Sequence, residues 1–122
     1  MIIRKLDQPV DMLTHVQGGE GIICRRQFLL PEDSCGAGRL FAVFTLAPGD
    51  SIGYHKHTGD YELYYILKGK AKVMDGDREE FMEEGDMMLC RDGGSHSIEA
   101  VGEEPMEFLA EILFPNERGN AR

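Results

Sequence analysis

The sequence lacks tryptophan and has only three cysteines, Cys24, Cys35 and Cys90, among its 122 residues. An odd count without a Cys-x-x-Cys pair argues against a disulfide framework and is typical of reduced thiols in a cytosolic protein. The simplest interpretation of each thiol is a small buried hydrophobe. The alternative, which applies to Cys90 alone, is a place in the wall of a ligand pocket.

Long apolar runs and basic charge are also scarce. The longest apolar stretches cover a few residues, far short of the ~20 that a membrane-spanning helix needs. Arg4 and Lys5 interrupt the N-terminus before any apolar region of a secretory signal, so we expect a cytoplasmic protein. Only 13 basic side chains stand against 22 acidic ones. The formal net charge of -9 repels phosphate backbones, and we expect neither a nucleic-acid partner nor a membrane partner.

The chain has the length of one domain, and 42% of its residues are hydrophobic, enough for one packed core. Short segments that alternate apolar and polar residues recur between glycine-rich and acidic turns, which is typical of an all-β sandwich or barrel. We expect an N-terminal arm over residues 1–20, a β-barrel over 21–114 and a C-terminal tail over 115–122. The expected strands are residues 21–29, 40–46, 51–57, 61–68, 70–74, 78–82, 86–90, 97–100 and 106–113.

Three of the four histidines are spaced so that one metal ion could use them. His55 and His57 are two residues apart, and residues i and i+2 of a strand point to the same face. Glu62 follows after a turn, and His96 follows two glycines that permit a sharp approach. Imidazole and carboxylate together suit a divalent transition metal (Mn, Fe, Ni, Cu, Co or Zn) better than calcium or magnesium. Taken alone, a His-x-His pair is more often a surface or hydrogen-bonded feature.

The spacing of these residues resembles two motifs of the cupin superfamily. Residues 49–69 read G-x5-H-x-H-x4-E-x6-G, which is similar to the first cupin motif at every fixed position. The second motif, G-x5-P-x-G-x2-H-x3-N, is met by Gly85, Gly93 and His96, with Arg91 in place of proline and Ala100 in place of asparagine. Neither departure removes a ligand residue.

This resemblance implies a single-domain cupin β-barrel, also described as a double-stranded β-helix or jelly roll. It implies that one divalent transition metal is bound by His55, His57, Glu62 and His96. It also implies a homodimer, because cupins of this size commonly pair their barrels, and the apolar N-terminal arm could pack on a second subunit.

Two functions remain open from the sequence. The first is a metal-dependent enzyme, such as an oxygenase, decarboxylase or isomerase, that acts on a small and anionic organic metabolite. The second is a non-catalytic module that binds or senses a small ligand. Tyr64 shares strand parity with Glu62 and is a candidate catalytic residue, although packing in the barrel is its simpler role. Candidates for binding an anion are Arg25, Gln27, Arg39 and Arg91.

Overall fold

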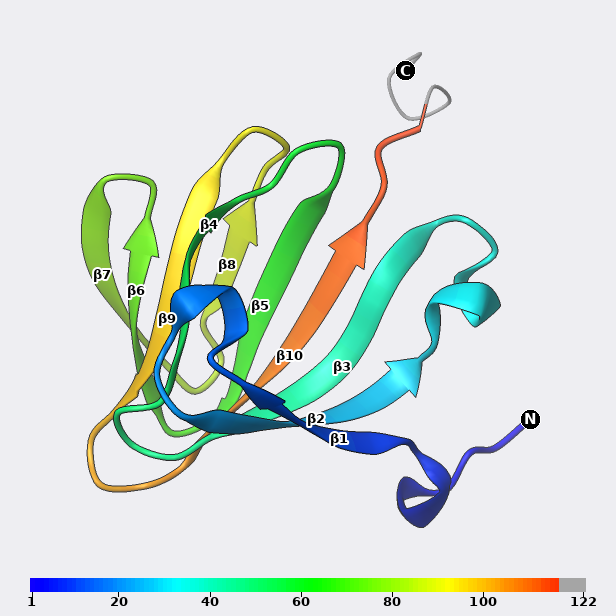
Figure 1. The fold of residues 1–122 in the computed structure, drawn as a ribbon, viewed down its shortest axis with the longest axis horizontal. Coiled ribbons are helices and arrows are strands. Elements are labelled where there is room, and N and C mark those ends of the chain that lie inside the picture. Colours follow the sequence, from blue (N-terminus) through cyan, green and yellow to red (C-terminus); the bar gives the residue numbers. More distant parts are fainter. Residues whose placement is uncertain (117–122) are drawn as a thin grey trace.

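A computed structural model describes residues 1–116, whose regular secondary structure is almost entirely β-strand (Figure 1). These residues form ten strands and three short 3-10 segments. The strands are β1 (Val10–Thr14), β2 (Ile22–Leu29), β3 (Gly38–Leu46), β4 (Ser51–Lys56), β5 (Tyr61–Lys68), β6 (Lys70–Asp75), β7 (Arg78–Glu83), β8 (Met87–Cys90), β9 (Ser95–Val101) and β10 (Met106–Leu113). The 3-10 segments are η1 (Lys5–Asp7), η2 (Val16–Gly18) and η3 (Pro31–Ser34). None of the described residues belongs to a helix long and apolar enough to cross a membrane.

The strands build two antiparallel sheets that lie face to face (Figure 1). The six-stranded sheet has the order β1-β2-β3-β10-β5-β8, and the four-stranded sheet has the order β4-β9-β6-β7. The expected all-β jelly roll is therefore present. The two sheets do not close into a barrel, because no strand ladder within residues 1–116 joins an edge of one sheet to an edge of the other.

Alternation along the strands places the core between the two sheets. Buried and partly exposed residues alternate without exception along β9 and β10. The inward residues of both sheets form one apolar cluster. Three aromatic rings lie in it: Phe44 stacks on Phe108 with ring centroids 5.3 Å apart, and Phe108 meets Tyr64 edge-on at 4.7 Å. Such contacts contribute beyond the area that they bury.

All nine expected strands have a counterpart within a few residues of the predicted bounds, but β1 is an additional strand. No strand before residue 21 is expected from the sequence. In β1 the usual pattern is inverted, because Val10 and Met12 are exposed while Asp11 is half-buried and paired with Arg25 of β2. A charged residue at an inward position conceals the period of the strand. The part of the expected tail from residue 117 onwards lies outside the described residues.

Residues 15–19, which contain η2, lie tightly against β4. A Cβ atom at Gly53 would be 2.1 Å from the backbone oxygen of Gln17, and one at Gly19 would be 2.2 Å from that of Ser51. Contacts this short leave space only for glycine at both positions. His15 and Gln17 have φ angles of 49° and 52°, which non-glycine residues rarely adopt. The segment is thus held at one wall of the cavity described below.

Candidate metal centre

The structure brings the four expected ligand residues together from both sheets. His55 on β4 pairs directly with His96 on the neighbouring strand β9. Glu62 lies on β5 of the other sheet. His57 lies one residue beyond the end of β4 rather than inside the strand. Its backbone is held by the loop before β9, since its N–H donates to Gly94 and its carbonyl accepts from Gly93, both at 2.8 Å.

One atom of each side chain points to a common centre. The Nε2 atoms of His57 and His96 are 3.1 Å apart, and each is 3.0 Å from Oε1 of Glu62. The Nε2 atom of His55 lies 3.2 Å from that of His96 and 3.9 Å from Oε1 of Glu62. Neighbouring ligands around an ion at ~2.1 Å are about 3 Å apart when they meet at right angles. The spacing of the four atoms therefore fits a single metal ion.

The hydrogen bonds behind this cluster decide which ring nitrogens face the centre. The Nδ1–H of His55 donates to the carbonyl of Gly53 at 2.7 Å, and that of His57 donates to Oδ1 of Asp60 at 2.6 Å. Because these partners only accept, each neutral ring presents the lone pair of Nε2 to the centre. Nδ1 of His96 is buried without a hydrogen-bond partner among the described residues.

With neutral rings, the Nε2 lone pairs and the carboxylate oxygen of Glu62 are hydrogen-bond acceptors that face one another. No proton lies between them to form a hydrogen bond. Side chains at this centre are well shielded from water, with His57, Glu62 and His96 only 2%, 3% and 1% exposed. A buried group of acceptors is costly unless a cation or protons satisfy it. The donor set of three imidazoles and one carboxylate therefore fits a divalent transition metal.

Without a metal, protons bound to the histidines satisfy the buried acceptors. Burial alone would raise the pKa of Glu62, but hydrogen bonds from His55, His57 and His96 outweigh it and hold that pKa well below its usual range. The hydrogen bond to Glu62 raises the pKa of His57, and Asp60 adds to the shift. Burial lowers the pKa of His96. The metal-free centre therefore keeps its carboxylate charged and holds its extra proton preferentially on His57.

Tyr64 is fully packed and also borders the cavity beside the cluster. Its ring stacks on that of His96 at a centroid distance of 4.7 Å and an interplanar angle of 8°. Burial, together with the negative charge of Glu62, raises the pKa of Tyr64 well above its usual range. The phenol is therefore neutral at physiological pH, where it can donate a hydrogen bond but cannot act as a base.

A cavity of about 190 Å³ opens beside the cluster. Its walls include Arg25 and Arg39 from the six-stranded sheet and Val16 and Gln17 from the segment packed on β4. Pockets for drug-sized molecules measure roughly 300–1,000 Å³, so this cavity suits a small metabolite. It is lined by Leu13, Val16, Gln17, Arg25, Arg39, Leu40, Phe44, Ile52, His55, Lys56, His57, Glu62, Tyr64 and Ile112.

The other residues that the sequence suggests for anion binding or for the pocket wall do not line this cavity. Gln27 and Arg91 are not among its lining residues. Cys90 is buried opposite Glu62 in the β5–β8 ladder and does not line the cavity either. Burial and the charge of Glu62 raise the pKa of the Cys90 thiol to about 11. Cys90 is thus a buried, protonated thiol behind the cluster, in agreement with the simpler interpretation. For Cys35 that interpretation is wrong, because Cys35 is exposed, and Cys24 is only partly buried.

Asp60 is the residue at this centre that the sequence analysis missed. It is 6% exposed, and its two oxygens accept from Nδ1 of His57 and from Nε of Arg39. Asp60 occupies a variable position of the motif, within a turn where aspartate is common for local reasons. Arg39 is 21 residues away in the chain, so no local pattern links the two.

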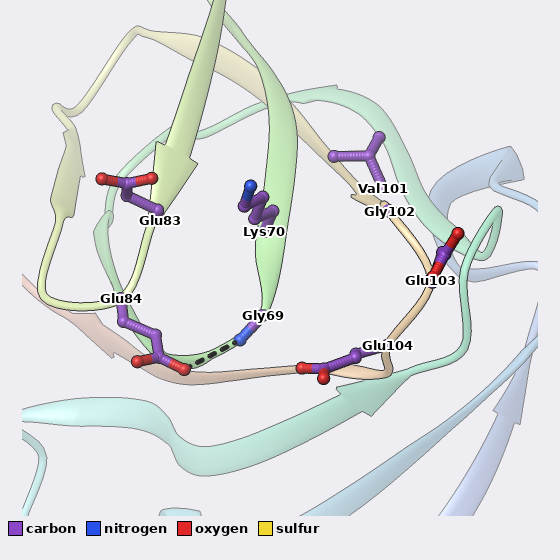
Figure 2. A pocket seen from close by; sticks show the side chains of 8 residues that line it. All are labelled: Gly69, Lys70, Glu83, Glu84, Val101, Gly102, Glu103 and Glu104. Carbon is purple, nitrogen blue, oxygen red and sulfur yellow. Dashed lines mark hydrogen bonds between the residues drawn. The ribbon is translucent and has the colours of Figure 1, made fainter.

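A wider hollow of about 700 Å³ lies at the opposite ends of β5 and β9. Figure 2 shows four glutamates around it, together with Lys70 at the start of β6. One of the carboxylates, that of Glu84, accepts from the backbone N–H of Gly69 at 3.4 Å. All four glutamates are exposed to solvent. Solvated acidic side chains of this kind do not form a preorganised site.

A family model described as "Cupin domain" matches residues 42–111, more than half of the chain. The chain belongs to the cupin family. Of the cupin motifs, the first lies wholly inside the matched range, and so does His96. The matched range thus includes strands of both sheets and all four residues of the cluster beside the cavity.

This cupin is similar to an oxalate-binding protein of Thermotoga maritima, with 36% identity over 114 residues, which cover 93% of this chain and 94% of the relative. It also resembles the crystal structure of a predicted oxalate decarboxylase from Thermotoga maritima, at 36% identity and a TM-score of 0.89, covering 94% of this chain and 100% of the other. An uncharacterized protein of Methanocaldococcus jannaschii is 32% identical over 85 residues, which are 69% of this chain and 67% of that protein.

Proposed function

We propose that this cupin holds one divalent transition metal through His55, His57, Glu62 and His96 and binds a small anionic organic molecule beside it. The observation that carries the proposal is the convergence of three Nε2 atoms and one carboxylate oxygen next to an open cavity. Four protein donors leave up to two positions on an octahedral ion. Open positions are what distinguish a working metal site from a structural one.

The chemistry of the cavity supports an anionic ligand. Arg25 and Arg39 border it, and guanidinium groups bind carboxylates with two parallel hydrogen bonds. Nε and Nη2 of Arg25 are already bound to Asp11, whereas Arg39 uses only Nε, for Asp60. The cavity is small, and the similar protein of Thermotoga maritima is named for binding oxalate. A short dicarboxylate, which could meet the ion and an arginine together, is therefore the ligand class that we propose, with oxalate as the first probe.

Binding is favoured over turnover by what the cavity offers. Among its described lining residues, the carboxylate of Glu62 belongs to the donor set and the phenol of Tyr64 is neutral. Asp11 and Asp60 are each tied to an arginine. Apart from these groups and the two arginines, Lys56 is the remaining ionisable side chain among the lining residues, which include no carboxylate or imidazole outside the donor set. We propose non-catalytic binding first and metal-dependent decarboxylation, oxygenation or isomerisation second.

The test begins with protein purified without chelators and analysed for metal by mass spectrometry. We expect about one equivalent in the wild type and a loss of most of it in His57→Ala and His96→Ala. The matched control is His15→Ala, which removes an imidazole outside the cluster and should retain the metal. Stoichiometric metal in either cluster variant would contradict the ligand assignment.

The ligand is tested by calorimetry of oxalate, with acetate as a control that has a single carboxylate. We expect oxalate to bind only to the metal-loaded protein and more tightly than acetate. Mass analysis of the same mixture for formate and carbon dioxide separates binding from decarboxylation. Equal affinity for the two acids, or for metal-free and metal-loaded protein, would contradict the proposed ligand class.

We also propose that the protein is a homodimer that buries the outer face of the six-stranded sheet. Strand register aligns one residue of each strand in a row on this face, and only one of the six is charged: Val10, Arg26, Val43, Leu109, Tyr65 and Met87. Val10, Tyr65 and Met87 are exposed, whereas Val43 is only 3% exposed. The outer face of the other sheet is polar, with Lys72 near both Glu79 and Glu99. Light scattering that shows a monomer at micromolar concentration would contradict this.

For the cell compartment we propose the cytoplasm. The three cysteines are free in the structure, and Cys90 is buried as a thiol. Thiols of this kind persist in reducing compartments. Fractionation of the native cells with an antibody against the protein would test the assignment, and recovery outside the cytoplasmic fraction would contradict it.

A further inference from the structure

We propose that Asp60 and Arg39 are positioning residues that hold His57 in its metal-binding orientation, and that Arg39 also anchors the anionic ligand. The second half rests on the proposed function. The inference starts from a chain of three side chains that runs from the surface to the cluster: Arg39, Asp60 and His57.

Both oxygens of Asp60 are committed to different partners. Oδ1 accepts from Nδ1 of His57 at 2.6 Å, and Oδ2 accepts from Nε of Arg39 at 2.8 Å. A carboxylate held on both sides has a fixed plane, and burial keeps water from competing for it. The short charge-assisted contacts therefore determine how the ring of His57 is turned.

The backbone around this contact is also fixed. His57 exchanges two backbone hydrogen bonds with Gly93 and Gly94, and the N–H of Gly59 donates to the side chain of Asp92 at 2.9 Å. The turn that carries Asp60 is thus attached to the loop before β9. The remaining freedom at His57 is the rotation and tautomer of its ring, and that is what Asp60 controls.

His57 differs from the other two histidines of the cluster in this respect. The ring of His55 is held by a backbone carbonyl, and Nδ1 of His96 has no partner among residues 1–116. Among the three rings, only that of His57 has its Nδ1 hydrogen-bonded to a side chain that substitution can change. Replacing a hydrogen-bond partner of this kind typically costs 10–100-fold in metal affinity.

The guanidinium of Arg39 also has atoms available toward the cavity in which we propose that the ligand binds. Only its Nε is used for Asp60, its side chain is 50% exposed, and it borders the cavity. Its terminal Nη atoms make no hydrogen bond with any described residue and can receive a carboxylate. An anion held there touches the same guanidinium that orients the carboxylate behind His57.

Arg25 provides a matched control in the same cavity. Its Nε and Nη2 atoms bind both oxygens of Asp11, at 3.0 and 2.6 Å. This pair has the same charged groups as Arg39 and Asp60, but Asp11 forms no hydrogen bond or ion pair with His55, His57 or His96. The Asp11 side chain is more exposed than that of Asp60, 41% against 9%, so Asp11→Asn controls for the loss of an aspartate paired with a cavity arginine and not for the loss of buried packing.

The first experiment measures Zn²⁺ affinity by competition with a chelator, without oxalate. We expect Asp60→Asn to bind Zn²⁺ at least 10-fold more weakly than the wild type, Arg39→Gln about 3-fold more weakly, and Asp11→Asn within twofold of it. The visible spectrum of the Co²⁺-loaded protein should change in Asp60→Asn and stay unchanged in Asp11→Asn. Wild-type affinity and spectrum in folded Asp60→Asn would overturn the positioning role. If that variant does not fold, Arg39→Gln at its half-exposed position carries the test.

The second experiment titrates oxalate into each variant at saturating Zn²⁺. We expect Arg39→Gln to lose at least 10-fold in oxalate affinity while Asp60→Asn stays within threefold of the wild type. Wild-type affinity in Arg39→Gln would overturn the anchoring half alone. If the wild type itself does not bind oxalate, the proposed ligand class fails and the anchoring half with it, while the first experiment still decides the positioning role.

Discussion

The affinity of the centre for metal should fall as the pH is lowered, because His57 must lose a proton before Nε2 can bind a cation. In the metal-free protein the hydrogen bond to Glu62 raises the pKa of His57 above its ordinary 6.5. Glu62 remains charged because its own pKa is well below its usual range, and burial lowers the pKa of His96. The proton on His57 is therefore the one that metal binding displaces first.

One displaced proton sets the size of the effect. Below the folded-state pKa of His57, the dissociation constant should rise about tenfold for each unit of pH, which is ~1.4 kcal/mol per unit. Two units below that pKa, binding is about 100-fold weaker. The metal-free protein follows the opposite trend, since a raised pKa means that proton binding stabilises the fold. That stabilisation is complete below about pH 6.5 and is lost as the pH rises through the folded-state value.

The assay is a chelator competition with Zn²⁺ from about pH 8 to about pH 5.5 at constant ionic strength. Calorimetry in two buffers of different ionisation enthalpy counts the released protons directly. In the His57→Ala variant there is no such proton, so its residual affinity should depend less on pH. A wild-type affinity that is constant over this range, or binding without proton release, would refute the reasoning.

Three further predictions concern packing and the cavity walls. Phe108→Ala should lower the free energy of unfolding by about 3–5 kcal/mol, because it removes a fully buried ring that stacks on Phe44 and meets Tyr64 edge-on. Urea unfolding followed by circular dichroism measures this, and a loss below ~1.5 kcal/mol would contradict it. Gly53→Ala should lower the free energy of unfolding by about 1–3 kcal/mol and weaken oxalate binding, because the added methyl group would displace Gln17 from the cavity wall. Unchanged stability and oxalate affinity would argue against this close contact. Asp11→Asn should lower the free energy of unfolding by at most about 1 kcal/mol, since the ion pair of Asp11 is partly exposed. In urea unfolding, the difference from the wild type should vanish as the pH falls through the lowered pKa of Asp11. A difference that persists in acid would indicate a loss of packing instead.

The strands and the cluster could be predicted because both depend on short-range patterns. Alternation with period two marks the inward residues of β9 and β10, and the cupin motif is a set of fixed spacings along one chain. Asp75 and Gly76 likewise predict the hairpin between β6 and β7, where Gly76 has a φ of 62°.

Features that depend on contacts between distant segments could not be predicted in this way. Strand β1 could not be predicted because a charged residue, Asp11, occupies an inward position. Its charge is neutralised by Arg25, which lies 14 residues away in the chain. The role of Asp60 depends on Arg39 and on the ring of His57, and neither contact has a signature in spacing. The open edges of the two sheets depend on strand lengths and twist, whereas alternation only says which residues face inward.

The division of the four donor side chains between two sheets would give a bound ion a mechanical role. His55 and His96 come from the four-stranded sheet and Glu62 from the six-stranded sheet, so a bound ion is a cross-link between layers that share no strand ladder. The link between Glu62 and His96 closes a loop of 34 residues. Because the unfolded chain does not hold these ligands together, the free energy of metal binding adds to the free energy of unfolding. Loss of the ion should therefore loosen this end of the sandwich first, and amide hydrogen exchange would rise together at the start of β5 and the start of β9.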